Sequence, residues 1–238
     1  MARRRFFVDS IHSGTAELHG EEARRLTRVL RVEPGQRYEI SDNQAAWLAE
    51  IVEARGERVL FRLIEQLESP PPPVNITLYA ALIKFDRFEW IIEKATELGV
   101  QRIVPVETIR VEKGLFEAAR KRTERWERIA RESSQQSRRV QVPEILAAVR
   151  LETALSGNAE HRYFLEEGSA PPLLQVLPPG RRPGACIGLL TGPEGGWPDA
   201  ERQLAEAAGW QAVSLSPQIL RSETAATAAI AILVNAWM

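Results

Sequence analysis

The sequence predicts an α/β protein made of a small β-rich domain followed by a larger domain of alternating strands and helices. The prolines at residues 70–73 separate the two, because consecutive prolines fit neither a helix nor a central strand. Before them, short runs of partly alternating apolar residues are typical of half-buried strands. After them, apolar runs alternate with helical patterns, which is typical of a parallel sheet. We expect domains at residues 1–69 and 74–238.

The first domain is expected to be a small β-barrel with one helix. Strands are expected at residues 36–42, 45–54 and 57–67. A helix is expected over residues 21–32, because apolar residues recur there every three or four positions. The residues expected on its buried face are Ala23, Leu26, Val29 and Leu30. Phe6 and Phe7 are expected to anchor the barrel core.

The second domain shows a longer series of elements. Strands are expected at residues 75–82, 100–108, 162–167, 185–191 and 210–216. Helices are expected at residues 87–99, 115–137, 199–209 and 223–237. Gly99 is expected to end the helix at residues 87–99. Cys186 stands in an apolar strand, so we expect it to be buried as a small hydrophobic residue.

Composition excludes several classes of protein. The 238 residues have a formal net charge of −1 and are 44% hydrophobic, which is ordinary for a soluble globular protein. A single cysteine allows no intrachain disulfide and suits a reducing cytoplasm. One cysteine and three scattered histidines predict no zinc site. We expect neither a signal peptide nor a membrane span, because no apolar run approaches the roughly 20 residues that a span needs.

The stretch "LLTGPEGGW", residues 189–197, predicts a ligand-binding turn between a strand and a helix. Ligands of open α/β sheets lie at the carboxyl ends of strands, and glycines let a flat ligand approach the backbone. The spacing matches neither a Walker loop nor the Rossmann fingerprint. The alternative is a tight turn that only caps the next helix.

A second turn of this kind covers residues 215–230, "LSPQILRSETAATAAI". Ser222 is a good candidate N-cap for the final helix, and Arg221 and Glu223 flank it. The small residues that follow favour close packing against a helix or a ligand. The alternative is a buried, well-capped C-terminal helix with no further role.

The paired stretches "GPEGG" and "LRSETA" resemble the loops of the SPOUT methyltransferases. In particular, the sequence resembles the branch that methylates uridine N3 in small-subunit ribosomal RNA, the RsmE family. Further matching stretches are "RRRFFV", "RRLTRVLRVEPGQ" and residues 84–100, 135–139 and 164–167. The resemblance implies a deep trefoil knot in the C-terminal α/β domain and a PUA-like RNA-binding barrel before it. It also implies S-adenosylmethionine as cofactor, a homodimer, and 16S ribosomal RNA, within the assembled small subunit, as substrate.

By the family's pattern, three loops surround the cofactor. The residues implied are Leu165, Glu166, Thr191, Gly192, Pro193, Glu194, Gly195, Gly196, Leu215, Ser216, Ile219, Leu220, Arg221, Glu223, Thr224 and Ala225. Trp197, beside the glycines, is a candidate for the pocket wall. On this resemblance, the cofactor is what approaches the glycines.

Arg221 and Glu223 are the main candidates for catalysis, and Glu194 is a further candidate base. Uridine N3 becomes nucleophilic when it loses its proton, and a cation beside the uracil oxygens would stabilise the resulting anion. Arg221 is the candidate for that cation, or for fixing a phosphate, although it could instead brace the loop through an ion pair. Glu223 is a candidate general base, or else a favourable charge at its helix start. Glu194 could take the base role or contact the cofactor or partner chain.

RNA binding requires positive surface. The candidate RNA-binding residues are Arg5, Arg24, Arg25, Arg28, Arg31, Lys84 and Arg139, with Arg3 and Arg4 beside the first of them. For the middle of the helix at 115–137 we favour a solvated face, with the ion pairs Glu124–Arg128 and Glu127–Arg131.

Two other functions stay open at this point. One is another SPOUT RNA methyltransferase, acting on a ribose 2′-hydroxyl or on transfer RNA. The other is a non-catalytic RNA-binding assembly factor that keeps the fold. Gln135 stands where the RsmE family usually has an acidic residue, which puts a catalytic role at that position in doubt.

Overall fold

The computed structural model describes residues 5–238. These residues group into two compact units, one formed by the chain up to Pro70 together with Arg131–Val142, the other by Pro71–Ala130 and Pro143–Met238. The first unit therefore includes a segment that lies far beyond the proline run. No helix in the described part of the chain is long and apolar enough to cross a lipid bilayer.

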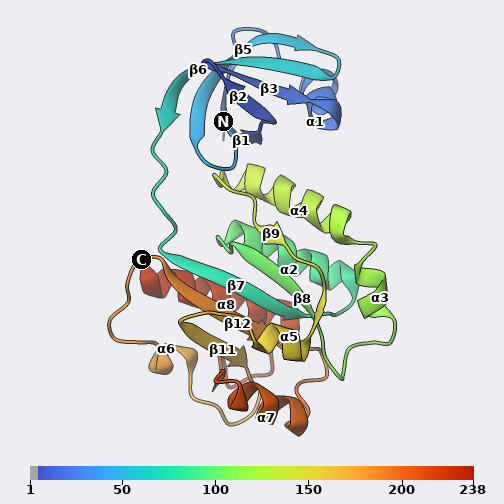
Figure 1. The fold of residues 1–238 in the computed structure, drawn as a ribbon, viewed down its shortest axis with the longest axis vertical. Helices are drawn as coiled ribbons and strands as arrows, with labels where there is room; N and C mark the ends of the chain where they lie inside the picture. The colour runs from blue at the N-terminus through green and yellow to red at the C-terminus, as the bar shows by residue number, and fades with distance from the viewer. Residues whose placement is uncertain (1–4) are drawn as a thin grey trace. The chain divides into compact units, whose positions relative to one another are not determined.

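A curled, six-stranded sheet forms the first unit (Figure 1). Its strands are β1 (Arg5–Phe7), β2 (Ser10–His12), β3 (Thr15–His19), β4 (Arg37–Ser41), β5 (Ala46–Arg55) and β6 (Arg58–Leu67). Their order is β1-β4-β5-β6-β3-β2, and two register shifts between β5 and β6 mark bulges that help the sheet to curl into a half-barrel. Phe6 and Phe7 are buried, which confirms that they are core residues.

The helix of the first unit differs from the expected one. It consists of α1 (Gly20–Arg24) and a π-helical turn, η1 (Arg25–Val29). The N–H of Leu30 donates to the carbonyl of Arg25, five residues earlier. This wider turn rotates the following residues off the apolar stripe. Ala23 and Leu26 are buried as expected, but Val29 is 72% exposed and Leu30 is also exposed, so that part of the prediction was wrong.

A parallel sheet forms the centre of the second unit. The strands are β7 (Val74–Ala81), β8 (Arg102–Glu107), β9 (Glu144–Ile145), β10 (Val149–Arg150), β11 (His161–Leu165), β12 (Ala185–Thr191) and β13 (Gln211–Val213). Their order is β10-β8-β7-β12-β11-β13, and β9 pairs with β8. The central pair, β7 and β12, is in register from Val74–Ala185 to Ala80–Thr191.

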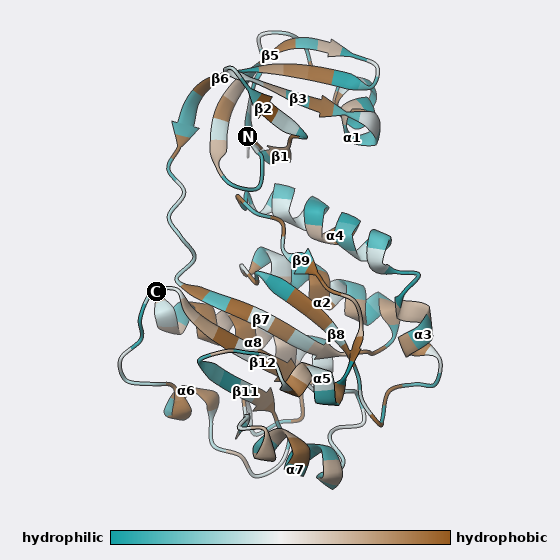
Figure 2. Ribbon diagram, viewed as in Figure 1, coloured by the Kyte–Doolittle hydropathy of each residue, from teal (hydrophilic) through white to brown (hydrophobic). Residues whose placement is uncertain are grey.

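Helices cover both faces of this sheet (Figure 1). They are α2 (Phe85–Glu97), α3 (Leu115–Ala119), α4 (Thr123–Gln136), α5 (Leu151–Leu155), α6 (Leu173–Val176), α7 (Asp199–Ala207) and α8 (Ser222–Trp237). On one face, Leu155 of α5 and Ala205 of α7 pack with Leu190 of β12 in one buried cluster. On the other face, α8 packs against α2 and β7. Figure 2 shows the hydrophobic residues concentrated on the central strands and on α8.

Two other expectations were wrong. The helix expected over 115–137 is interrupted between α3 and α4. The interruption lets Arg122 lie over the Phe85 ring, 4.9 Å from its centroid, while Trp126 is buried. Cys186 is exposed, because it lies near the amino end of β12, before the strand is covered on both faces.

Candidate functional site

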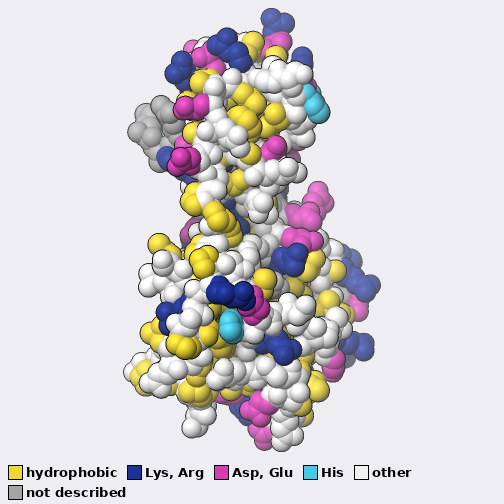
Figure 3. Space-filling model, turned by 60° about the vertical axis from the view of Figure 1, so that its left-hand side comes forward, with side chains coloured by type: hydrophobic (Ala, Val, Ile, Leu, Met, Phe, Trp, Pro, Cys, Tyr) yellow, Lys and Arg dark blue, Asp and Glu magenta, His cyan; other side chains and the backbone are white. Residues whose placement is uncertain are grey.

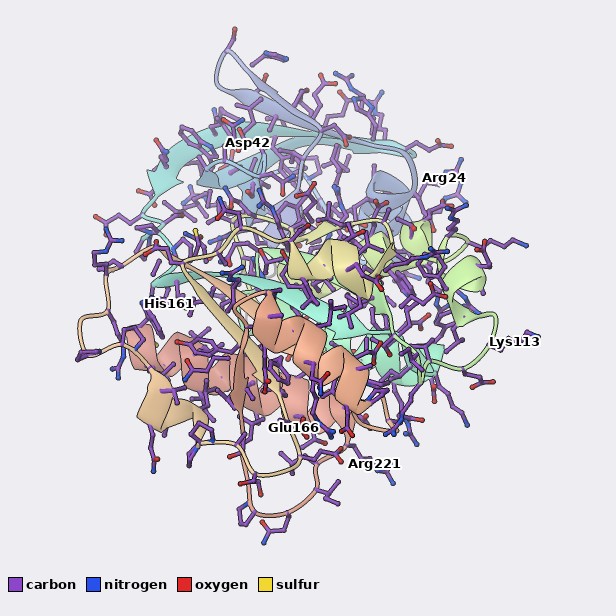
Figure 4. The ribbon with its side chains drawn as sticks, turned by 60° about the horizontal axis from the view of Figure 1, so that its bottom comes forward. Arg24, Asp42, Lys113, His161, Glu166 and Arg221 are labelled. Atoms are coloured by element: carbon purple, nitrogen blue, oxygen red, sulfur yellow. The ribbon has the colours of Figure 1, made fainter. Side chains whose placement is uncertain are left out.

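A pocket of about 380 Å³ lies at the carboxyl ends of β11 and β12 and beside the start of α8. It is built by the three loops that the resemblance singled out. The lining residues are Arg87, Leu165, Glu166, Glu167, Thr191, Gly192, Pro193, Glu194, Gly196, Trp197, Leu215, Ser216, Gln218, Ile219, Leu220, Arg221, Ser222 and Ala225. Figure 4 shows Glu166 and Arg221, from two of these loops, at the same end of the molecule.

Three of the expected cofactor residues, Gly195, Glu223 and Thr224, are outside this lining. Conversely, the sequence reasoning missed Arg87, Glu167, Gln218 and Ser222 as lining residues. The position of Arg87 could have been predicted, because Arg87 follows β7, the strand that pairs in parallel with β12. The carboxyl ends of neighbouring parallel strands meet at the same edge, so the start of α2 belongs beside the glycine loop, Gly192–Trp197.

Atoms of the protein itself lie close to the glycines of this loop. A Cβ on Gly192 would lie 3.0 Å from the indole of Trp197, and a Cβ on Gly195 would lie 3.2 Å from Cδ of Arg110. Gly196 has a φ of +68°, which glycine adopts at little cost. Side chains at these positions would therefore meet the protein's own atoms, whether or not a ligand also approaches them. Trp197 both lines the pocket and donates from Nε1 to the Leu165 carbonyl at 2.8 Å.

Ser222 joins the two C-terminal loops. It is the first residue of α8, with Arg221 in the N-cap position, and its side chain caps no N–H of the helix. Instead, its hydroxyl donates to the carbonyl of Gly192 at 2.8 Å. The expected capping role is therefore wrong, and the hydroxyl fixes the glycine loop instead.

Charged groups surround the pocket opening. Arg87 forms an ion pair with Glu194, and its Nε lies 4.0 Å from Oε1 of Glu223. The other carboxylate oxygen of Glu223 is buried and lacks a hydrogen-bond partner in the described structure. Within residues 5–238, the Arg221 guanidinium forms no ion pair, so the loop-bracing alternative lacks the carboxylate that it requires.

The carboxylate of Glu166 is committed to other protein groups. It forms an ion pair with Arg202 and accepts hydrogen bonds from the N–H groups of Glu167 and Gly168 at 2.9 and 3.0 Å. Burial opposes ionisation, but these donors outweigh it and hold the pKa of Glu166 below its ordinary value. These partners hold Glu166 in place in the wall of the pocket.

Comparison with known proteins identifies the family. The sequence profile of the RNA methyltransferase domain matches residues 70–234. The ribosomal RNA small subunit methyltransferase E of Synechocystis is 34% identical over 232 residues, covering 91% of this chain and 70% of that protein. The chain belongs to the ribosomal RNA small subunit methyltransferase E family. The member from Aquifex aeolicus is 31% identical over 215 residues, covering 87% of this chain and 89% of its own.

The solved structures of this methyltransferase E family extend the likeness to the whole fold. The enzyme from Neisseria gonorrhoeae, crystallised bound to S-adenosyl methionine, superposes with a TM-score of 0.88 at 32% identity. The match covers 99% of this chain and 98% of that chain. Both units therefore share the fold of the methyltransferase E enzymes.

The arginines expected to bind RNA in this methyltransferase E chain differ in burial and in their partners. Arg5 is 8% exposed, pairs with Glu39 at 3.0 Å and donates to the carbonyl of Arg138, so its side chain already has structural partners. Arg139 is half-buried, and burial lowers the pKa of its guanidinium to about 10. Arg3 and Arg4 lie outside the described residues.

Of the arginines in and just after α1 and η1, two lie beside carboxylates and two are exposed. Arg24 forms an ion pair with Glu57, and Arg25 lies 3.7 Å from Glu132. Arg28 and Arg31 are exposed. Lys84 is exposed at the N-cap of α2 in the second unit. On the face in Figure 3, basic and acidic side chains are mixed.

The structure also shows the partners of two residues of α4, Arg131 and Gln135. Arg131 donates to the carbonyl of Phe7 at 2.8 Å and lies over its ring, in place of the expected pair with Glu127. Gln135 is buried in the first unit and donates to Glu22 at 2.8 Å. The amide at this position therefore has a structural partner in this methyltransferase E chain.

Proposed function

We propose that this chain transfers a methyl group from S-adenosylmethionine to N3 of a uridine in 16S ribosomal RNA. The observation that carries the proposal is the pocket formed by the glycine loop, the 165–168 loop and the start of α8. A family member of 32% identity has been solved with S-adenosyl methionine bound. We therefore propose that this pocket binds the cofactor and that the family's substrate, ribosomal RNA, accepts the methyl group.

The pocket residues fit such a cofactor. Its volume of about 380 Å³ lies within the range of small-molecule sites. Leu165, Leu215 and Leu220 supply apolar wall. Thr191 is 1% exposed, and its hydroxyl is without a hydrogen-bond partner in the described structure, so a polar ligand group could satisfy it. Bound here, S-adenosylmethionine supplies an electrophilic methyl group.

The chain's own residues would then position and activate the uracil. Arg221, exposed at the pocket edge, stabilises the negative charge that N3 deprotonation spreads onto the uracil oxygens. Glu223, which directly follows the lining residues Arg221 and Ser222, is the candidate proton acceptor, because one of its carboxylate oxygens is buried without a hydrogen-bond partner among residues 5–238. Arg87 lies beside this carboxylate and fixes its orientation.

The finer architecture belongs to the same proposal. We assign residues 74–238 to a SPOUT domain with a deep trefoil knot, and residues 1–69 to a PUA-like RNA-binding domain. We further propose a homodimer, with the ribosomal RNA bound as part of the small subunit in the cytoplasm. Family membership supports each of these assignments.

We assign the RNA contacts by the exposure of each arginine and by whether a carboxylate already pairs with it. Arg28 and Arg31 are the main phosphate contacts proposed in the first unit, because both are exposed. Arg24 and Arg25 contribute less, because carboxylates already compensate them. Lys84 adds a positive charge at the start of α2.

The decisive test is methylation of purified small subunits from a strain that lacks the gene. With labelled S-adenosylmethionine, we expect one uridine to gain one methyl group and to stop reverse transcriptase, since N3 methylation blocks the pairing edge. Methylation of a ribose hydroxyl, which would protect the neighbouring phosphodiester from alkali, would contradict the proposal. Cofactor binding without transfer to any RNA would favour an assembly factor.

A further inference from the structure

The glycine loop is held by groups from several elements. Ser222 of α8 bonds the carbonyl of Gly192, and Arg87 of α2 pairs with Glu194. A third anchor comes from the segment after β8, where the guanidinium of Arg110 donates to the carbonyl of Gly195. The first two anchors line the pocket, but Arg110 lies outside its lining.

Arg110 also packs against the glycine loop. A Cβ on Gly195 would lie 3.2 Å from Cδ and 3.6 Å from Cβ of Arg110. Gly195 has no positive φ, so its backbone conformation is open to other residues. The contact that favours glycine at this position is therefore the stem of Arg110.

The backbone next to Arg110 is itself held by a hydrogen bond. The N–H of the preceding residue, Ile109, donates to Oε1 of Glu201 at 2.8 Å. Glu201 is 5% exposed and belongs to the first turn of α7, which directly follows the glycine loop. A closed ring of contacts thus runs from the glycine loop through α7 to Ile109 and back through Arg110.

We propose that Arg110 is a positioning residue for cofactor binding, which holds the glycine loop in its pocket-lining shape without reaching the cofactor. This inference rests on the proposed function of the pocket. A loop that is already ordered loses less conformational freedom when a ligand binds. Without Arg110, that ordering is added to the free-energy cost of binding.

A double-mutant cycle tests the inference. Calorimetry would measure the dissociation constant of S-adenosylmethionine for wild type, Arg110→Ala, Gly195→Ala and the double variant. We expect Arg110→Ala to weaken binding about tenfold, the scale of one hydrogen bond to a charged group. Gly195→Ala should also weaken binding, because its methyl group displaces Arg110. The double variant should bind no more weakly than Arg110→Ala alone.

Two controls separate positioning from general stability. Arg150→Ala removes an exposed arginine of the same unit that pairs with Glu107, and should leave the affinity unchanged. The melting temperature of the cofactor-free Arg110→Ala protein should stay within the small range of surface substitutions. Arg110→Lys should restore part of the affinity, since it keeps a donor on a long stem.

The outcomes are distinguishable. If wild type does not bind S-adenosylmethionine, the proposed function fails and the role of Arg110 fails with it. If wild type binds and Arg110→Ala binds equally well, only the inference about Arg110 is overturned. If Gly195→Ala weakens binding equally with and without Arg110, Gly195 faces the ligand and the inference is again overturned.

Discussion

The hydroxyl of Ser222 donates a 2.8 Å hydrogen bond to the carbonyl oxygen of Gly192. The two residues are 30 positions apart, and the bond joins the start of α8 to the end of β12. Since both loops line the pocket, this single contact ties together two of its walls. The binding site therefore depends on an internal hydrogen bond between the two stretches that carry the family resemblance.

Replacing Ser222 with alanine should loosen this junction. We expect a loss of about 1 kcal/mol in the free energy of unfolding, the net value of one hydrogen bond, and severalfold weaker cofactor binding. Chemical denaturation and calorimetry measure the two effects. Ser156→Ala is the control, because its hydroxyl donates to the carbonyl of Thr153, three residues earlier. Equal effects of the two substitutions on cofactor affinity would contradict a role for Ser222 in the pocket.

Gly192→Ala should destabilise the protein through Trp197. The added methyl group would lie 3.0 Å from the indole, so the ring has to move although it is buried. Overpacking of this kind costs about 1–3 kcal/mol in the free energy of unfolding. The matched control is Gly180→Ala, where a Cβ meets nothing within 4 Å. A Gly192→Ala protein as stable as this control would show that the ring adapts freely.

The ion pair of Glu166 with Arg202 predicts a dependence of stability on pH. The pKa of Glu166 is lower in the folded protein than in the unfolded chain, because Arg202 and two backbone N–H groups outweigh the effect of burial. Its stabilisation is therefore complete above the unfolded value of about 4.3 and is lost as the pH falls through the folded value.

Urea denaturation of wild type and Glu166→Gln tests this dependence. The difference in their free energies of unfolding should be largest near neutral pH and should shrink below about pH 4. Glu160→Gln removes an exposed partner of Arg182 and should have little effect at any pH. A Glu166→Gln difference that is constant from pH 7 to pH 3 would contradict the expected linkage.

The sequence was sufficient for the order of the main elements and for most of the pocket. The strand expected at 185–191 is β12 itself, because a buried parallel strand bounded by turn residues leaves a clear pattern. The roles of Val29 and Leu30 could not be read in the same way, because a π-helical turn changes the period that assigns a residue to a face. Local periodicity carries no information on that change.

The sequence also could not predict side-chain partners that are distant along the chain. Arg5 in a basic cluster looked like an RNA contact, but its partner Glu39 is 34 positions away. Likewise, the sequence could not show that a side chain at position 195 would lie 3.2 Å from Cδ of Arg110, which is 85 positions away. In both cases the residue type was informative, but its partner was fixed by tertiary packing.

RNA binding should depend on Arg28 and Arg31 more than on Arg24 and Arg25. The first two are exposed, whereas the last two already lie beside carboxylates. Replacing Arg28 and Arg31 with alanine should weaken binding to small-subunit RNA and reduce the salt slope by about 2, one unit for each phosphate left without its arginine. Filter binding at several salt concentrations measures the slope. The comparison variant replaces Arg24 and Arg25 with alanine. If both double variants keep the wild-type slope, none of the four arginines contacts phosphate.

The sharpest test of catalysis concerns Arg221. Its guanidinium lies at the pocket edge and forms no ion pair within residues 5–238, so its removal leaves no carboxylate unpaired. If it stabilises the charge that develops on the uracil, its effect is made mainly in the transition state. Arg221→Ala should then slow single-turnover methylation about 100-fold or more, the scale for one preorganised donor.

The accompanying changes distinguish catalysis from loop structure. Cofactor affinity of Arg221→Ala should fall much less than the rate, and Arg221→Lys should rescue poorly, because an ammonium lacks the planar fork of the guanidinium. Ser222→Ala is the informative comparison, since it acts on the loop and should change affinity and rate together. If Arg221→Ala behaves like Ser222→Ala in both measurements, Arg221 holds the loop and does not act on the uracil.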